Sequence, residues 1–361
     1  MFCLTAARRS CCCIALLLAA LLPRTVLAQQ FSEAELDAFA EEVRRDGFTL
    51  IPSVLPPAKL RAMRAAFRPV LAKRMLSSPS DRGPARYYAT PPFVPPFWDP
   101  DVFAHPAIVG VVARLVGADA VLCQFAVDTP LNGSALQDVH RDAAPLFPEQ
   151  HQHPAGAAAD AAAADAATAA ADEPPAAQLA VNFPLVDVLP ATGNGPTEVA
   201  AATHRLTLAQ AKPYLEAFAA DCFTTPADCS AETMRLQQLL QPVYMRLGDV
   251  LLRDVRGLHR GTPNHSAEPR EMVVMGYSRA WLRRPEVALR VKQSLYDGLR
   301  GGNSGAVARA LLRFEERVPD AAFEHEYDGR ESYDAAVLGA ASGGSYRGVS
   351  VSASADSTVE A

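Results

Sequence analysis

The sequence predicts a mainly β domain with flanking helices (α+β), arranged as an antiparallel barrel or jelly roll. Short apolar segments with the residue types of strands, such as 178–188 and 250–254, are separated by turns rich in Gly and Pro. Helical patterns frame these strands toward both ends of the chain. Many short strands with such turns are typical of closed or two-sheet antiparallel folds.

The N-terminal elements have clear boundaries. Ser32 and Glu35 form a capping box that opens a helix, and Asp46-Gly47 ends it. A strand is expected over 48–54. Pro56-Pro57 then begins a second helix, because proline is favoured in the first turn.

The segment 87–106 is rich in proline and aromatic residues, so we expect a long loop. Long loops in compact domains are often functional, and the part near Trp98 is a hypothesised lid that excludes water. The elements expected after it are a helix at 108–115, strands at 120–128, 178–188, 197–202, 243–247, 250–254 and 272–277, and helices at 206–220, 232–240 and 307–313.

Residues 1–28 have the layout of a secretory signal peptide. Arg8 and Arg9 precede the apolar run Cys11–Leu22, and Ala28 offers a small residue for cleavage. The run is short for a membrane span, although an uncleaved anchor is the alternative. We therefore expect no stable membrane span after cleavage, and localisation in the secretory pathway, either secreted or in the ER or Golgi lumen.

The rest of the chain is expected to form one domain, 29–335, followed by a disordered Gly/Ser-rich tail, 336–361. An Ala-rich insert, 155–177, interrupts the domain. It has no large apolar side chains to bury, so we expect it outside the core. The net charge is −6 and no Lys/Arg run is present, which argues against a nucleic-acid partner.

Three cysteines remain after the expected cleavage. Cys222 and Cys229 flank a short turn-rich stretch and, in an oxidising lumen, are either a disulfide or two free thiols. Cys123 lies in an apolar strand and is expected to pack as a small hydrophobe.

A candidate metal site lies in His140-Arg141-Asp142 and the distant His259. Residues at alternate positions of a strand project to the same face, so His140 and Asp142 would converge. A second imidazole from His259 would complete a 2-His-1-carboxylate site, which leaves adjacent coordination positions open and suits non-haem Fe(II). A His-x-Asp motif alone is weak evidence, because it arises often by chance.

The order of several motifs is more specific, and with it the sequence resembles the phytanoyl-CoA dioxygenase family over roughly residues 31–282. The first metal motif of that family is similar to Gln137–Asp142. Its central hairpin is similar to Asn182–Asp187 and Gly193–Glu198, ending at Thr203-His204-Arg205. Its distal motif is similar to the Gly248-Asp249 turn followed by His259 and Arg270.

The resemblance implies a cupin-like double-stranded β-helix and an oxygenase that uses Fe(II), 2-oxoglutarate as cosubstrate and O2. The implied metal ligands are His140, Asp142 and His259. Arg270 would bind the distal carboxylate of 2-oxoglutarate, because a guanidinium matches a carboxylate bidentately. Gln137 and Asn182 are weaker candidates for contacting the cosubstrate or orienting a ligand. His204 is expected to shape a turn.

Two details refine this expectation. Asp142 is retained, whereas halogenating relatives have a small residue there, so we expect hydroxylation. Position 261 is Gly, where relatives often carry a hydroxyl, and this puts a second cosubstrate contact in doubt.

The expected substrate is a small molecule, a lipid, or a protein or glycan side chain. The alternatives are a non-catalytic secreted binding protein with a structural or vestigial metal site, and a metal hydrolase that would leave Arg270 without a role.

Overall fold

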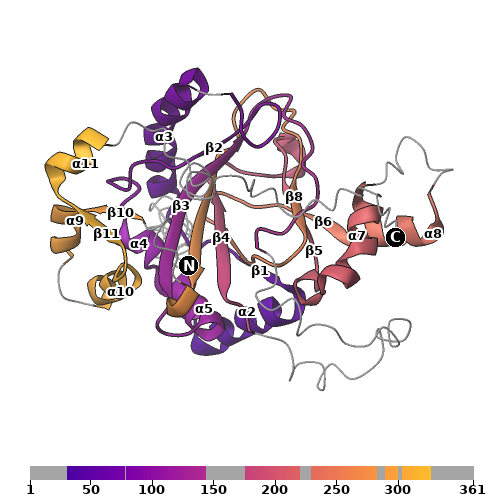
Figure 1. Cartoon of the computed structure of the whole chain (residues 1–361), viewed down its shortest axis with the longest axis horizontal. Coiled ribbons are helices and arrows are strands. Elements are labelled where there is room, and N and C mark those ends of the chain that lie inside the picture. Colours follow the sequence, from indigo (N-terminus) through magenta and orange to yellow (C-terminus); the bar gives the residue numbers. More distant parts are fainter. Residues whose placement is uncertain are drawn as a thin grey trace, which may run out of the picture.

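Two antiparallel sheets lie on opposite sides of a central pocket and form a double-stranded β-helix, as predicted (Figure 1). The computed structural model describes residues 31–77, 79–143, 175–219, 229–282, 289–299 and 303–326. The expected signal peptide, most of the Ala-rich insert and the expected tail lie outside the described residues.

The larger sheet has six strands in the order β1-β7-β4-β9-β3-β2. Their bounds are β1 Phe48–Ile51, β7 Val250–Asp254, β4 Gln178–Pro184, β9 Met272–Ser278, β3 Val121–Pro130 and β2 Arg86–Ala89. The smaller sheet has the order β6-β5-β8, with bounds Leu240–Val243, Thr197–Ala200 and His259–Gly261. All pairings in these two sheets are antiparallel.

Alternation along the central strands separates the core from the pocket. On β4, Leu179, Val181 and Phe183 join the hydrophobic core, while Ala180 and Asn182 line the pocket. Strands β9 and β7 follow the same period of two, and β3 follows it after a register shift between Leu122 and Gln124. The sheet is therefore apolar on its outer face and carries polar groups on its inner face, because successive side chains of a strand point to opposite sides.

Helices α2 (Glu33–Asp46), α3 (Pro57–Ser77) and α5 (Pro106–Val116) contribute apolar side chains to that core (Figure 1). The predicted capping box at Ser32 and Glu35 is present, and α2 ends at Gly47 in the left-handed conformation. Helix α4 (Pro100–Phe103) lies between this layer and a small C-terminal unit. That unit comprises β10 (Arg290–Lys292), α9 (Gln293–Asp297), α10 (Asn303–Leu311), β11 (Glu316–Val318) and α11 (Asp320–Glu326).

Helices α7 (Leu208–Ala219) and α8 (Ala231–Gln237) project beyond the smaller sheet (Figure 1). Short 3-10 turns occur at Pro190–Thr192, Thr203–Arg205 and Ala280–Leu282. No helix in the described ranges is both long and apolar enough to span a bilayer.

Several predicted boundaries were wrong. The strand expected at 48–54 ends at Ile51, and the one expected at 243–247 is β6, which ends at Val243. Strands β2, β8, β10 and β11 were not predicted. The segment expected to be a loop, 87–106, contains most of β2, all of α4 and the first residue of α5. The end of the Ala-rich insert also differs from the prediction, because Ala176 packs in the core.

The lid hypothesis is contradicted by the packing of Trp98. Its side chain is buried with Phe93 and Phe103, whose ring centroids lie 5.2 and 5.5 Å away. The described residues that line the pocket do not include Trp98. Burial of these large rings against the outer face of the sheet outweighs the tendency of a proline-rich segment to remain a loop.

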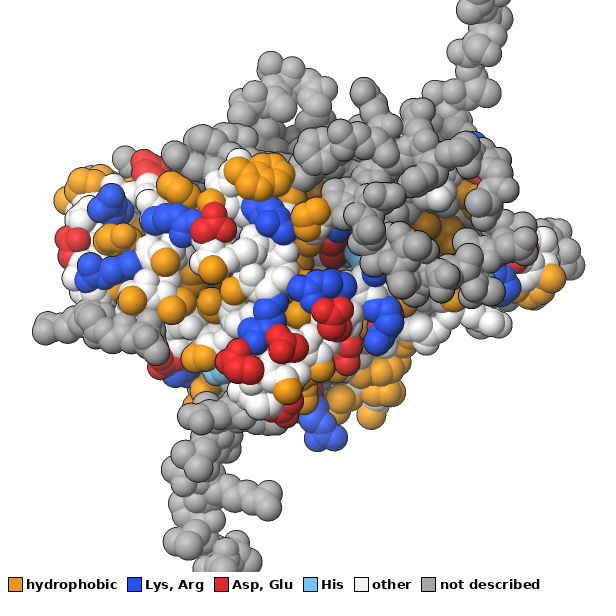
Figure 2. Space-filling model, turned by 90° about the horizontal axis from the view of Figure 1, so that it is seen from below, with side chains coloured by type: hydrophobic (Ala, Val, Ile, Leu, Met, Phe, Trp, Pro, Cys, Tyr) orange, Lys and Arg blue, Asp and Glu red, His pale blue; other side chains and the backbone are white. Residues whose placement is uncertain are grey.

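The face formed by α2 and α5 carries both signs of charge close together (Figure 2). Arg114 pairs with Glu33 and Asp37, and Arg45 pairs with Asp46. Exposed pairs of this kind add little stability, but they leave this face without a broad patch of one sign.

The Gly248-Asp249 turn fixes the start of β7 against the segment after β1. The Gly248 carbonyl accepts hydrogen bonds from the amides of Val54 and Leu55, each at 2.9 Å. The Asp249 carboxylate accepts from the amides of Ser53 at 2.9 Å and Arg246 at 2.7 Å. Gly248 has φ +113°, and a Cβ there would lie 2.8 Å from the Leu55 carbonyl oxygen.

We expect Gly248→Ala to lower the free energy of unfolding by more than the roughly 1–2 kcal/mol that a left-handed φ costs an L-residue. The additional loss comes from the clash with the Leu55 carbonyl. Urea unfolding of Gly133→Ala is the matched control, because Gly133 has φ +76° with nothing within 4 Å of an added Cβ. Equal losses for the two variants would contradict the contribution of the clash.

Candidate metal centre

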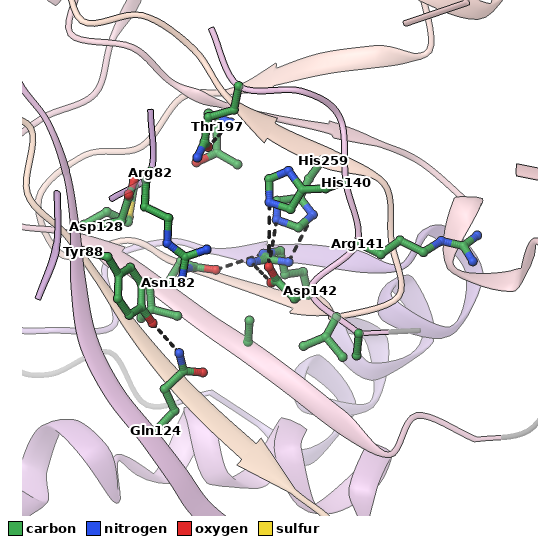
Figure 3. Close-up of a pocket in the computed structure, with 18 of the residues that line it drawn as sticks. Arg82, Tyr88, Gln124, Asp128, His140, Arg141, Asp142, Asn182, Thr197 and His259 are labelled. Carbon is green, nitrogen blue, oxygen red and sulfur yellow. Dashed lines mark hydrogen bonds and ion pairs between the residues drawn. The ribbon is translucent and has the colours of Figure 1, made fainter. Parts of the chain in front are cut away.

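His140, Asp142 and His259 meet at one side of the pocket (Figure 3). Each offers one ligand atom, and the three atoms lie within 4.8 Å of one another. Asp142 Oδ1 is 3.9 Å from His140 Nε2 and 3.5 Å from His259 Nε2. The structure therefore brings together the three residues proposed from sequence, in an arrangement that could hold one ion.

Backbone pairing places these side chains. His140 and His259 form an antiparallel bridge in which each amide donates to the other's carbonyl at 3.0 Å. The Asp142 amide donates to the Val255 carbonyl at 3.0 Å, so the segment of Asp142 stays hydrogen-bonded to the segment that leads to His259. Directly opposed residues of an antiparallel pair project to the same side, so the two imidazoles lie together, with ring centroids 4.4 Å apart.

Each imidazole is oriented by a carbonyl two residues before it. Nδ1 of His140 lies 2.8 Å from the Asp138 carbonyl oxygen, and Nδ1 of His259 lies 3.0 Å from that of Gly257. With Nδ1–H donating to these oxygens, Nε2 of each ring keeps its lone pair on the side of Asp142. This is the usual way in which a protein fixes the tautomer of a metal-binding histidine.

The protonation states suit a cation. Burial lowers the pKa of His140 to about 4, so its imidazole is neutral near pH 7. Burial raises the pKa of Asp142, but the positive charge of the neighbouring Arg253 outweighs this effect and holds that pKa well below its usual range. His140 therefore offers a neutral nitrogen and Asp142 an ionised carboxylate.

Arg253 of β7 is a site residue that the sequence analysis missed. Its Nη2 donates to Asp142 Oδ2 at 2.5 Å, its Nε donates to Asn182 Oδ1 at 3.1 Å, and its Nη1 lies 3.4 Å from His259 Nδ1. Arg253 and Asn182 are both buried. The guanidinium holds one carboxylate oxygen of Asp142, while the other oxygen faces the histidines. The sequence suggested that Asn182 contacts the cosubstrate or orients a ligand. In this structure its side chain instead accepts a hydrogen bond from Arg253.

Arg270 lies at the end of the pocket near Asp128 and is 1% exposed. None of its three guanidinium nitrogens has a hydrogen-bond partner in the part of the chain that the structure describes. Its Nη2 lies 3.8 Å from Asp128 Oδ2. Burial lowers the pKa of Arg270 to about 10, so it stays charged at neutral pH. A buried cation with unused donors is unfavourable unless an anion binds to it.

Gly261 is explained by what fills the space beside it. A Cβ at this position would clash with Nη1 of Arg86 and lie 2.5 Å from Oε1 of Gln137. Arg86 is fully buried and donates to Asp128 Oδ2 at 3.0 Å and to the Thr262 carbonyl at 2.9 Å. Gln137 Oε1 accepts from the Gly261 amide at 2.9 Å. A guanidinium and an amide therefore occupy the space that a side chain at position 261 would need.

Other predicted residues lie elsewhere. His204 is outside the cluster, buried in the turn Thr203–Arg205, with Nε2 3.2 Å from the Arg44 carbonyl oxygen.

Cys229 is disulfide-bonded, while Cys222 lies outside the described residues. Their pairing stays a prediction. Cys123 is half-buried on β3.

A family model described as phytanoyl-CoA dioxygenase (PhyH) matches residues 43–272, which is more than half of the chain. The chain belongs to the phytanoyl-CoA dioxygenase family. This is a family of Fe(II)- and 2-oxoglutarate-dependent oxygenases, so iron and 2-oxoglutarate are its metal and cosubstrate. The matched range includes all three residues of the cluster and Arg270.

Solved structures with a similar fold are distant in sequence. The non-heme alpha ketoglutarate dependent epimerase SnoN from nogalamycin biosynthesis is 18% identical over 69% of this chain and 84% of its own, with a TM-score of 0.45. HygX from Streptomyces hygroscopicus, with nickel and 2-oxoglutarate bound, is 13% identical over 73% and 91%, with a TM-score of 0.47. AviO1 from Streptomyces viridochromogenes Tue57 is 18% identical over 71% and 99%, with a TM-score of 0.44.

We expect His140→Ala and Asp142→Asn to weaken binding of Ni(II), a stable substitute for iron, by more than 100-fold. Loss of an orienting partner of a ligand typically costs about 10- to 100-fold, and loss of a ligand should cost more. Isothermal titration of the metal-free protein measures this. His265→Ala is the matched control, because His265 is exposed and outside the cluster. Unchanged affinity in either ligand variant would remove that residue from the site.

Arg253→Met should weaken Ni(II) binding by about 10- to 100-fold, because Asp142 loses the donor that fixes its second oxygen. Arg253→Lys should retain most of the affinity, since it keeps a cation near that oxygen. Visible absorption of the Co(II)-loaded protein reports coordination geometry and should change in Arg253→Met. Tighter binding in Arg253→Met would show that repulsion between the guanidinium and the metal outweighs orientation.

Proposed function

We propose that this protein is a hydroxylase that inserts oxygen into a C–H bond of its substrate, which is a small molecule, a lipid, or a protein or glycan side chain. The observation that carries the proposal is a single pocket that holds both a 2-His-1-carboxylate cluster and a buried guanidinium with unused donors. Hydroxylation, rather than epimerisation or another oxidation by the same cofactors, is the part of the proposal that goes beyond the family.

His140, Asp142 and His259 would hold Fe(II) from one side and leave three adjacent positions for other ligands. When bound, the iron and 2-oxoglutarate supply the oxidising power: O2 is reduced, 2-oxoglutarate is converted to succinate and CO2, and one oxygen atom enters the substrate. The protein would orient these groups and bind the cosubstrate.

Arg270 would bind the distal carboxylate of 2-oxoglutarate. Its planar fork can donate two parallel hydrogen bonds to a carboxylate, and its burial strengthens them. Arg86 and Asp128 lie beside Arg270 and hold each other, so they limit where the Arg270 side chain can move. Gln137 lines the same pocket, with its Oε1 already bonded to the Gly261 amide.

The retained Asp142 supports hydroxylation over halogenation, because a carboxylate in that position fills the site that a halide would need. The alternative of a non-catalytic binding protein with a structural metal gives no reason for the unpartnered donors of Arg270, and neither does a metal hydrolase.

We also propose that the protein acts in the secretory pathway. The support for this is the signal-peptide pattern of residues 1–28.

We expect Arg270→Gln to raise the dissociation constant of 2-oxoglutarate by about 30-fold or more, since losing one partner of a buried charge pair costs about 2 kcal/mol or more. The anaerobic Fe(II) protein can be titrated with 2-oxoglutarate by its visible absorption, and substrate-independent succinate formation gives a second measurement. Arg279→Gln is the matched control, because Arg279 is a part-buried arginine bonded to the Ala176 and Leu115 carbonyls. Equal affinity in Arg270→Gln and wild type would refute this role.

A further inference from the structure

We propose that Asn132 carries an N-linked oligosaccharide, attached while the protein passes through the secretory pathway. Two segments of the chain, Asn132-Gly133-Ser134 and Asn264-His265-Ser266, fit the acceptor pattern Asn-x-Ser/Thr of this modification. The proposal goes beyond the oxygenase activity and rests on the proposed secretory location. The two asparagines differ in the fold, and only Asn132 is suited to carry a glycan.

Asn132 lies in an exposed turn that follows β3. The Ser134 amide donates to the Leu131 carbonyl at 3.0 Å and closes the turn, and both Asn132 and Gly133 are exposed. A Cβ added to Gly133 would meet no atom of the described residues within 4 Å, so the space over the turn is open. A bulky hydrophilic group attached here would extend into solvent, as a surface glycan does.

The side-chain amide of Asn132 has a hydrogen that can be replaced. Within the described part of the chain, its Nδ2 donates one hydrogen bond, to the Ser266 carbonyl at 2.9 Å. Because Nδ2 carries two hydrogens, this bond uses one of them and leaves the other for substitution. A glycosylated asparagine amide keeps one N–H, so the modified side chain can retain its bond to Ser266.

Asn264 offers no such hydrogen. It is 0% exposed, and its Nδ2 donates to the carbonyls of Pro130 at 3.0 Å and Glu268 at 2.8 Å. Its Oδ1 accepts from the Ser266 amide at 2.8 Å and from the Ser266 hydroxyl at 2.7 Å. A sugar on Nδ2 would remove one of these bonds and would have no room in the interior, so a chain modified at Asn264 should not reach this fold.

The two acceptor segments are joined to each other. Asn132 and Asn264 form a parallel bridge in which the Gly133 amide donates to the Asn264 carbonyl at 2.9 Å. The Asn264 amide in turn donates at 3.0 Å to Oγ of Ser134, which is buried. Asn264 therefore holds the turn from the inside and leaves Asn132 on the outside. Asn132 is not among the described residues that line the metal pocket, so a glycan on it begins outside that pocket.

The sugar donor would be an oligosaccharide linked to a polyprenyl pyrophosphate in the lumen. A bond forms between Asn132 Nδ2 and the anomeric carbon of the first sugar, while the bond from that carbon to the pyrophosphate oxygen breaks. The pyrophosphate leaves with the electron pair of the broken bond, and Nδ2 gives up one proton. No oxidant or reductant takes part.

The test expresses the full chain with its own residues 1–28 in insect cells, a host that attaches N-linked glycans. Peptide-N-glycosidase treatment in heavy-oxygen water converts each glycosylated asparagine to a labelled aspartate, which peptide mass spectrometry locates. An incubation without the enzyme corrects for spontaneous deamidation at Asn132-Gly133. We expect most copies to be labelled at Asn132 and none at Asn264.

Asn132→Gln should abolish the change in electrophoretic mobility that the glycosidase causes. Ser266→Ala is the matched control, because it destroys the second acceptor segment and keeps the backbone carbonyl that Asn132 contacts. This variant should show the same change in mobility as wild type. Asn132→Gln should bind Ni(II) within about twofold of wild type, because an exposed side chain outside the pocket contributes little to the fold, and this also shows that the variant is folded.

Two results would overturn the proposal: an unmodified Asn132 in protein recovered from the secretory pathway, or a glycan on Asn264 in folded protein. A companion chain, in which an established signal peptide replaces residues 1–28, separates these failures from a failure of the proposed location. Modification of Asn132 in the companion chain alone would refute the secretory location and, with it, glycosylation of the protein. A secreted companion chain with an unmodified Asn132 would refute the site itself.

Discussion

The candidate site depends on one backbone contact, the antiparallel bridge between His140 and His259. Two reciprocal hydrogen bonds of 3.0 Å join segments that are far apart in the sequence. Because opposed residues of such a pair project to the same side, the bridge brings the two imidazoles together, and Asp142 follows at the next position of the same face. The chain between the two histidines can vary in length without disturbing the cluster as long as this pairing persists. An insertion such as the Ala-rich segment is therefore compatible with the site.

The pocket is formed by the inner face of a sheet whose outer face is the hydrophobic core. Leu179, Val181 and Phe183 of β4 pack outward, and the same strand turns Ala180 and Asn182 inward. Stability and function are thus assigned to alternate residues of the same strands. The rigid packing of the outer face fixes the positions of the polar groups on the inner face, and this rigidity is what a metal site and a cosubstrate site both require.

The sequence was sufficient for the fold class, for the helix that ends at Gly47 and for the three residues of the cluster. It was insufficient where a role depends on contacts between distant strands. Arg253 interrupts the apolar run of β7, and a charge within a buried strand was the only local signal of its role. Its partners Asp142 and Asn182 become neighbours only after the sheet forms. At the Trp98 segment the prediction from the local sequence was wrong. Its prolines favour an exposed loop, whereas the burial of its aromatic rings in the core determines how it packs.

The buried arginines can be distinguished by what already occupies their donors. Arg253 is bonded to Asp142 and Asn182, so its donors serve the protein and it acts on the metal ligand. Arg86 is bonded to Asp128 and to a backbone carbonyl, so it supports its neighbours. Arg270 has no hydrogen-bond partner for its guanidinium among the described residues, although it is as deeply buried as Arg86. Desolvating a cation whose donors make no hydrogen bond is unfavourable, and the Asp128 carboxylate, 3.8 Å away, compensates this only in part. A ligand anion supplies the remaining compensation at Arg270, and this is the physical reason for placing the cosubstrate there.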